Sequence, residues 1–217
     1  MSKQETVKRY LLLTVALFFI GLGIAFTKHG NIGISPVSSV ANVISSKYTF
    51  LSFGMWLTVT YGVLLFGQFL LLRRKFKPVY LLQLPMSFLT GYFSDFGLFI
   101  AGFFSNDSYI SKILLVLFGS GILAFGIALS VCADVILNAG EAFVKALADT
   151  TNKKFGDTKV VFDICWVALA VLLSLVFFHG KVVGVREGTV ISALLVGTIV
   201  KLLQTRLEKP LTRLLKK

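Results

Sequence analysis

Two groups of polar side chains interrupt an otherwise apolar chain, and their types suit the binding of a small polar or ionic solute. The first group is Asn31 and Ser35, and the second is Asp134, Asn138 and Glu141. Ser35 and Asn138 are suitable helix caps, and the start of a helix carries a partial positive charge. If the two short helices that begin here dip into the protein, their ends form a polar site. If they lie flat on a membrane surface instead, Glu141 merely caps its own helix.

Gln83 and Asp95 complete the candidate solute-binding residues, because each lies within an apolar segment. A charge at the centre of a membrane span costs roughly 2.5 to 3.5 kcal/mol on insertion scales. Asp95 therefore either binds a coupling proton or cation, or marks an interface where its span ends. Gln83 lies close to Pro85, which frees a backbone carbonyl, and its amide can bind a solute or a neighbouring helix.

Catalytic and metal-dependent functions find no support in the sequence. The chain contains no P-loop, no Gly-x-Ser-x-Gly elbow and no His-Glu-x-x-His motif. Its two histidines, His29 and His179, have no partner at metal-ligand spacing. We therefore expect no catalytic residue, no metal and no cofactor, and a protein that is not an enzyme.

The composition places these polar residues in a membrane protein. Of the 217 residues, 56% are hydrophobic and 15% are charged, whereas soluble domains have about 45–50% and about 25%. This excludes disorder and argues against a soluble enzyme. The net charge of +12 would suit a nucleic-acid-binding protein, but such proteins gather their charge on one exposed face. Here the basic residues fall between long apolar runs, so we expect a lipid bilayer and no nucleic acid as partner.

Six apolar stretches are long enough to cross a bilayer, which takes about 20 residues per helix. They cover residues 9–28, 50–72, 79–104, 111–133, 160–179 and 187–205. Only helices and closed barrels satisfy the backbone within lipid, and these runs lack the alternation of barrel strands. The sequence predicts an all-α bundle of six transmembrane helices in a single domain over residues 1–217, in which residues 206–217 form a basic cytoplasmic tail.

The basic residues also predict an orientation, because they gather on the cytoplasmic side of membrane proteins. If the N-terminus lies inside, most of the 22 lysines and arginines fall in inside segments, notably around residues 73–77, 145–159 and 201–217. We therefore expect a multi-pass membrane protein with both termini in the cytoplasm.

The chain also contains an internal repeat, about 9–104 and about 111–205. A shift of 103 residues aligns the end of the first span in each half, matching Gly23, Ile24 and Ala25 with Gly126, Ile127 and Ala128. The same shift aligns the candidate site residues Asn31 and Ser35 with Asp134 and Asn138. Towards the end of each half the shift grows to 106, which matches Lys75, Leu89 and Gly91 with Lys181, Leu195 and Gly197.

Each half contains three spans, with one short helix after the first. Because three is an odd number, the second half enters the membrane from the opposite side, and the repeat is inverted. Inverted repeats are common in secondary transporters, in which two similar halves open a central site to each side in turn. The small residues Ser120, Ala124 and Ala128 predict close approach of another helix within this bundle.

The order and spacing of five stretches resemble the YitT and YczE type of bacterial integral membrane proteins. The stretches are GLGIAFTKHGNIGISP, LLQLPMSFLTGYFSD, AGEAFVKAL, KKFGDTKVVFDI and GVREGTVISALLVG. The resemblance covers nearly the whole chain and implies a small multi-span protein of the bacterial inner membrane, transporter-like and without an established substrate. The pair Cys132 and Asp134 departs from the pattern, so no binding role is carried over to Cys132.

Together these observations predict a small inner-membrane transporter that moves an unidentified small polar or ionic solute by alternating access between its two halves. Two alternatives stay open. The chain could be a substrate-binding subunit that depends on a partner ATPase, or an accessory or regulatory protein whose short helices dock a partner. A second copy of the chain, in a homodimer, is a further candidate partner.

Overall fold

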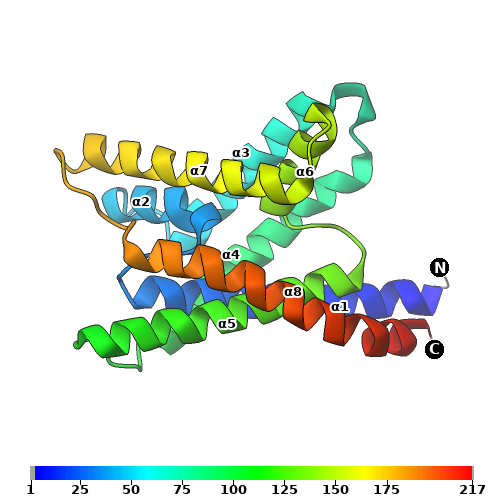
Figure 1. Ribbon diagram of the computed structural model, residues 1–217, viewed down its shortest axis with the longest axis horizontal. Coiled ribbons are helices and arrows are strands. Elements are labelled where there is room, and N and C mark those ends of the chain that lie inside the picture. Colours follow the sequence, from blue (N-terminus) through cyan, green and yellow to red (C-terminus); the bar gives the residue numbers. More distant parts are fainter. Residues whose placement is uncertain (1–2, 217) are drawn as a thin grey trace.

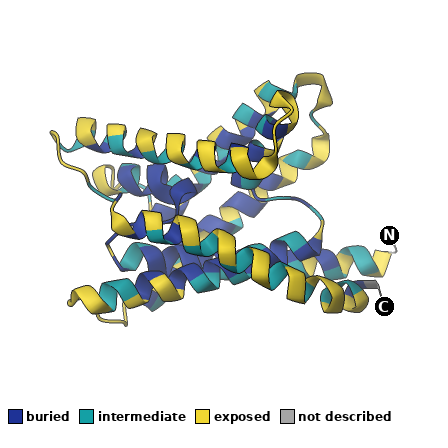
Figure 2. Ribbon diagram, in the orientation of Figure 1, coloured by how far each residue is buried: buried dark blue, intermediate teal, exposed yellow. Residues whose placement is uncertain are grey.

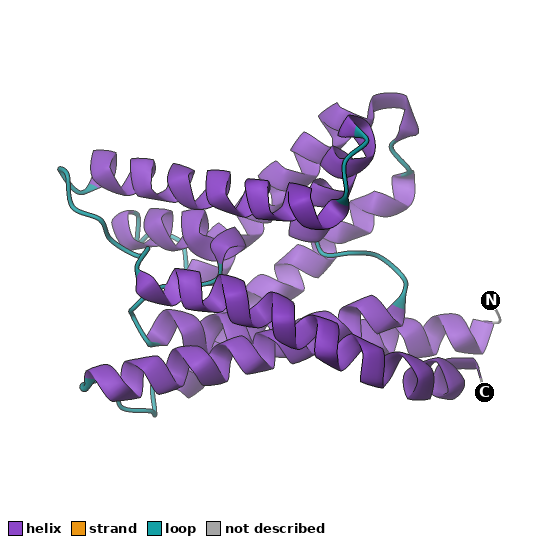
Figure 3. Ribbon diagram, in the orientation of Figure 1, coloured by secondary structure: helices purple, strands orange, loops and turns teal. Residues whose placement is uncertain are grey.

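The computed structural model describes residues 3–216, which form helices and connecting loops without any strand (Figure 1, Figure 3). Its α-helices are α1 (Lys3–His29), α2 (Ser39–Lys47), α3 (Phe53–Leu72), α4 (Gln83–Ala101), α5 (Tyr109–Ala133), α6 (Ala139–Thr151), α7 (Phe155–Phe177) and α8 (Glu187–Lys216). Three short 3₁₀ helices accompany them: η1 (Pro36–Ser38), η2 (Arg73–Lys75) and η3 (Pro78–Leu82). The predicted all-α class is confirmed.

Five of these helices, α1, α3, α5, α7 and α8, are long and apolar enough to cross a membrane. Exposed positions lie along the outer sides of the helices (Figure 2). Many of the exposed residues are large and apolar, among them Phe66, Phe99, Val176 and Leu194. Soluble proteins rarely expose so much apolar surface. The chain is therefore a membrane protein.

The remaining predicted span corresponds to α4, which is shorter and more polar than expected. It has 19 residues, among them the polar Ser87, Thr90, Ser94 and Asp95, and it is not one of the five helices that qualify as membrane spans. It begins at Gln83, not near residue 79, because η2 and η3 occupy the connection that precedes it. The number of six spans stays a prediction. At the other end of the chain, α8 continues as helix to Lys216, through most of the predicted tail.

Helices α1 and α5 pack against each other at the centre of the bundle. Their backbones approach so closely that a Cβ atom on Gly23 would lie 2.4 Å from the Leu123 nitrogen. In the same way, a Cβ atom on Gly126 would lie 2.6 Å from the Ile20 nitrogen. The two glycines are equivalent in the predicted repeat, and each allows the other helix to approach.

The small residues of α5 also lie inside the bundle. Ala124 and Ala128 are fully buried, and Ser120 Oγ lies 2.9 Å from Ser192 Oγ on α8. The prediction that these small residues allow close helix packing within the chain is confirmed.

The other helices pack in pairs that match each other between the two halves. Helix α4 packs on α1, as α8 packs on α5. The short helix α2 packs on α7, as the short helix α6 packs on α3. Each half therefore contributes its short helix to the other half. Both termini lie at the same end of the molecule (Figure 1).

Candidate functional site

The two loops that precede the short helices have the same backbone geometry. Asn31 and Asp134 both adopt left-handed conformations, with φ of 55° and 51°. The Asn31 N–H donates to the Lys28 carbonyl at 3.0 Å, and the Asp134 N–H donates to the Val131 carbonyl at 3.2 Å. Asparagine and aspartate tolerate this conformation better than most residues, which explains why these types end the two long helices.

Each loop then leads into the start of a short helix at Ser35 or Asn138. Asn138 caps α6, as predicted, since its Oδ1 accepts from the Ala139 N–H at 2.7 Å. Ser35 lies at the equivalent position before Pro36, but its hydroxyl donates to Ser38 Oγ at 3.0 Å and makes no capping bond. The side chain of Ser35 therefore binds none of the backbone N–H groups at the start of η1.

Both short helices are enclosed by other parts of the protein. Five consecutive residues of α2, Ser39–Val43, are buried, and six residues of α6 are buried against α3 and α7. The Trp166 side chain on α7 also donates to the Val37 carbonyl at 3.0 Å, which fixes η1 in place. This arrangement favours site-forming helices over helices with one face on lipid.

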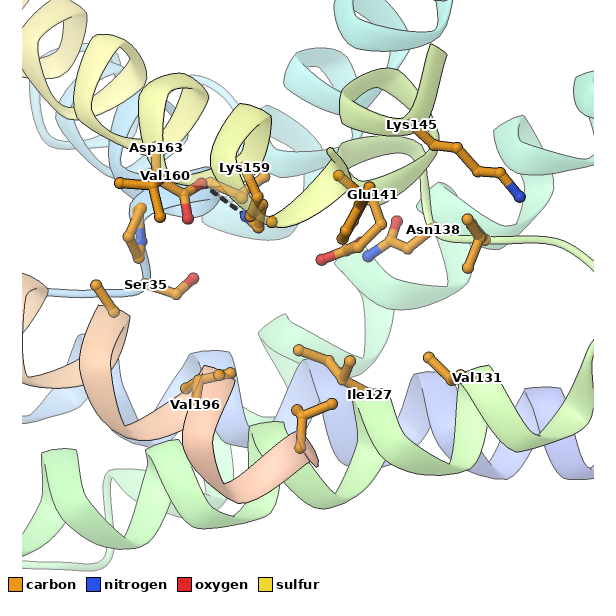
Figure 4. Close-up of a pocket in the computed structure, with 18 of the residues that line it drawn as sticks. Ser35, Ile127, Val131, Asn138, Glu141, Lys145, Lys159, Val160, Asp163 and Val196 are labelled. Atoms are coloured by element: carbon orange, nitrogen blue, oxygen red, sulfur yellow. Dashed lines mark hydrogen bonds and ion pairs between the residues drawn. The ribbon is translucent and has the colours of Figure 1, made fainter. Parts of the chain in front are cut away.

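A cavity of about 850 Å³ lies where the two short helices begin (Figure 4). We call it the central cavity. Ile20 and Ile24 of α1, Ile127 and Val131 of α5, and Val196 of α8 form apolar parts of its wall. Its polar lining includes Ser35, Asn138, Glu141, Lys159 and Asp163, which come from η1, α6 and α7. Three of the predicted site residues, one from the first half and two from the second, are thus brought together.

Glu141 is the acidic residue nearest the start of α6, and its carboxylate points into the central cavity beside Asn138 (Figure 4). Burial raises the pKa of Glu141 above the ordinary value of a glutamate, and the charge of Lys159 offsets part of that increase. Buried ionisable groups with shifted pKa values are often found at functional sites.

Lys159 and Asp163 form an ion pair along α7, with Lys159 Nζ 2.6 Å from Asp163 Oδ1. Neither residue was among the predicted site residues, so sequence reasoning missed their place in the cavity wall. The pair is one turn inside the start of α7 and far along the chain from Ser35. No feature of the sequence indicated that α7 would face η1.

The other predicted site residues do not reach the central cavity. Asn31 is exposed on its loop. Asp134 and Gln83 line a second cavity of about 560 Å³, bounded by α3, α5, α6 and the connection before α4. We call it the side cavity. Asp134 has an exposed side chain whose Oδ2 lies 3.8 Å from Arg9 Nη1, whereas Gln83 is only 1% exposed.

Asp95 holds the start of α3 and lines neither cavity. Its Oδ1 accepts from the Gly54 N–H at 2.7 Å, and its Oδ2 accepts from the Ser52 hydroxyl. The Ser52 hydroxyl in turn caps α3. These contacts favour a structural role for Asp95, which neither alternative included, over a site for a coupling ion.

Replacing Asp95 with alanine should therefore destabilise the protein without altering solute binding. The Gly54 N–H and the Ser52 hydroxyl lose their acceptor, which is expected to cost about 1–3 kcal/mol. Thermal unfolding of the purified protein in detergent measures the change. Asp107→Ala, in an exposed loop, is the control and should have little effect; equal stability of the two variants would contradict the assigned role.

Comparison with known proteins places the chain in a family. No curated protein and no solved structure matches it. The model of a family of unknown function, DUF6198, matches residues 7–205, which include both short helices and both cavities. The chain belongs to the family of unknown function DUF6198.

Proposed function

We propose that the protein is a small transporter of the bacterial cytoplasmic membrane that moves a small polar or ionic solute by alternating access. The observation that supports this most directly is the central cavity. Ser35 and Asn138, which are equivalent in the repeat, line it together at the starts of the two short helices. Solute sites of transporters with inverted repeats lie between the halves and are formed by interrupted helices.

An inverted arrangement of six spans, three in each half, is part of this proposal. The matching pairs of helices, the equivalent glycines Gly23 and Gly126 and the two left-handed loop residues all support it. The short extra helix of each half is α2 or α6. The relationship to the YitT and YczE type of membrane proteins belongs to the same proposal.

The proposed orientation places both termini in the cytoplasm. The lining of the central cavity continues to Lys153 and Lys201, which lie in segments assigned to the cytoplasmic side by their positive charge. The structure would then correspond to a state that is open to the cytoplasm. Ser35, Asn138 and Glu141 would bind the solute, and Glu141 would take up a coupling proton or cation.

A stabilisation screen against a metabolite library tests solute binding. A ligand that binds only the folded protein stabilises it by RT ln(1 + [L]/Kd) and therefore raises its unfolding temperature. We expect a small polar or ionic compound to stabilise the purified protein and to be moved by it in proteoliposomes. A screen with working controls that finds no stabilising compound and no movement under any imposed gradient would contradict the proposal.

Glu141→Gln should reduce transport by roughly tenfold or more, since hydrogen bonds to charged groups contribute about 1.5–3 kcal/mol. The variant should also change the pH dependence of stability. A raised pKa in the folded state means that ionised Glu141 opposes folding, so the wild type loses stability as pH rises through this pKa.

The glutamine variant lacks this loss and should be the more stable protein at neutral pH, with a smaller difference in acid. Thermal unfolding of both proteins across the pH range measures the effect. Glu187→Gln, in an exposed ion pair with Arg186, is the control. The assigned role of Glu141 would be excluded by two results together. The wild type and the Glu141→Gln variant would be equally stable at every pH, and the variant would transport the solute at the full rate.

A further inference from the structure

At one end of the molecule, the loop between α1 and η1 is hydrogen-bonded to the start of α8. The Gly188 N–H donates to the Ile32 carbonyl at 2.7 Å, and the Ile34 N–H donates to Thr189 Oγ1 at 3.2 Å. Ile32, Ile34 and Thr189 are all buried. We call this the closed end, because direct contact between main chains leaves no passage there.

Ser174 of α7 secures the connection that leads into this contact. Its hydroxyl donates to the Lys181 carbonyl at 3.0 Å and accepts from the Val183 N–H at 2.7 Å. Ser174 is fully buried. Thr189 and Ser174 thus hold the start of α8 and the preceding loop in the closed position.

The repeat has glutamines at the two equivalent positions of the first half. The shift of 106 residues aligns Gln83 with Thr189 and Gln68 with Ser174. Gln83 is 1% exposed and Gln68 is 3% exposed. Within residues 3–216, the unpaired buried side-chain polar atoms are both amide atoms of Gln83 and Oε1 of Gln68. Hydroxyl groups that are satisfied at the closed end therefore correspond to amides that are unsatisfied at the other end.

The side cavity separates these glutamines from the loop that they would be expected to bind. Val135 and Leu137 are the equivalents of Ile32 and Ile34, and they line the side cavity together with Gln83 and Gln68. In the described range, no hydrogen bond joins this loop to the start of α4. We call this the open end.

A solute in the side cavity would not explain the unpaired amides. The three atoms have almost no accessible surface, so a solute could reach them only after the surrounding helices had moved. An unpaired buried polar group is costly, so each such group in a native structure needs an explanation. A rearrangement that pairs Gln83 is therefore the simpler explanation.

We propose that Gln83 forms the latch of a second conformation in which the two ends exchange roles. In that state the start of α4 closes onto the main chain of Val135–Leu137, and the contact of Thr189 with Ile34 is broken. Gln68 then holds the connection of residues 75–77, as Ser174 now holds residues 181–183. The inference rests on the proposed alternating access and adds the groups that stabilise its second state.

The test measures how often the closed end opens. Cys132 and Cys165 are replaced by serine, and Val185→Cys introduces one cysteine at a position that is 8% exposed and packed against α2. A membrane-impermeant maleimide then labels this cysteine from the side of the closed end. Its rate follows the population of the second state, because the site becomes accessible only when the closed end opens.

Variants at opposite ends of the molecule should change this rate in opposite directions. Thr189→Val removes a contact of the present state and should raise labelling about fivefold, whereas Gln83→Leu removes the latch of the second state and should lower it about fivefold. The second effect is measured in the Thr189→Val background, where labelling is faster. The controls are Thr198→Val, whose hydroxyl bonds only within α8, and Gln4→Leu, which is exposed.

If Gln83→Leu leaves the labelling rate unchanged, Gln83 does not stabilise the second state. If it raises the rate, the substitution has only loosened the structure. Either result would overturn the proposed latch. The measurement needs no solute. Opposite effects of the two variants in a protein that transports nothing would therefore support the latch and count only against the proposed function. Normal transport with unchanged labelling would count only against the latch.

Discussion

Replacing Gly23 with alanine is expected to destabilise the bundle, and by more than the same change at Gly21, where the nearest atom would lie 2.7 Å away. The new Cβ atom would lie 2.4 Å from the Leu123 nitrogen, 2.6 Å from its Cα atom and 2.7 Å from the Gly119 carbonyl oxygen. All three are backbone atoms, so no side-chain rotation relieves the overlap and α5 must move away. Overpacking of this kind costs typically 1–3 kcal/mol and occasionally more.

The matched control is Gly121→Ala on α5, where an added Cβ atom meets nothing within 4 Å. This change should be neutral or should stabilise the protein by up to about 1 kcal/mol, because alanine favours helix. Thermal unfolding in detergent and the yield of folded protein measure both variants. If Gly23→Ala is as stable as Gly121→Ala, then α1 and α5 do not pack backbone to backbone.

Replacing Arg9 with methionine should have the second large effect, a loss of about 3–5 kcal/mol, as expected when one partner of a buried ion pair is removed. Arg9 is 7% exposed. Its Nη1 donates to the Ala133 carbonyl at 2.9 Å, and its Nη2 lies 2.9 Å from Glu5 Oε1. The guanidinium therefore caps the end of α5, where a positive charge is favourable.

Lys3→Met provides the control for Arg9, since Lys3 lies in the same helix but is exposed. It removes the same charge and should change the unfolding temperature little. Similar unfolding temperatures for the two methionine variants would show that Arg9 acts only as a surface cation. Nothing in the sequence indicated the contact with Ala133, because Arg9 lies at the first residue of the predicted span 9–28 and its partner lies far along the chain.

The long helices were predictable because membrane spans need continuous apolar runs, which a sequence displays directly. The start of α4 was predicted about four residues too early, because Pro78 begins a 3₁₀ helix and the α-helix starts only at Gln83. The residues Ser35 and Asn138 were predictable as a pair because they precede helix starts at equivalent positions of the repeat. Their convergence on one cavity depends on the exchange of short helices between halves, which is a tertiary feature.

Burial and pairing of polar side chains were the least predictable features. In the sequence, Asp95 is a charge within an apolar span. In the structure, its carboxylate accepts hydrogen bonds from the Gly54 N–H and the Ser52 hydroxyl at the start of α3. Conversely, Gln83 was expected to bind a solute or a neighbouring helix through its amide, yet both polar atoms of that amide are unpaired. A sequence shows that an amide lies in an apolar run, but not whether a partner lies within hydrogen-bonding distance.

The crossing of α1 and α5 has a mechanical consequence. Where two helices meet through side chains, small rotamer changes let one slide along the other, but at Gly23 and Gly126 backbone meets backbone. The nearest atoms at these two positions belong to the backbone of the other helix, so side-chain rotation cannot relax the contact and we expect α1 and α5 to move as one unit. In the proposed change of state, the other helices would therefore move relative to this pair.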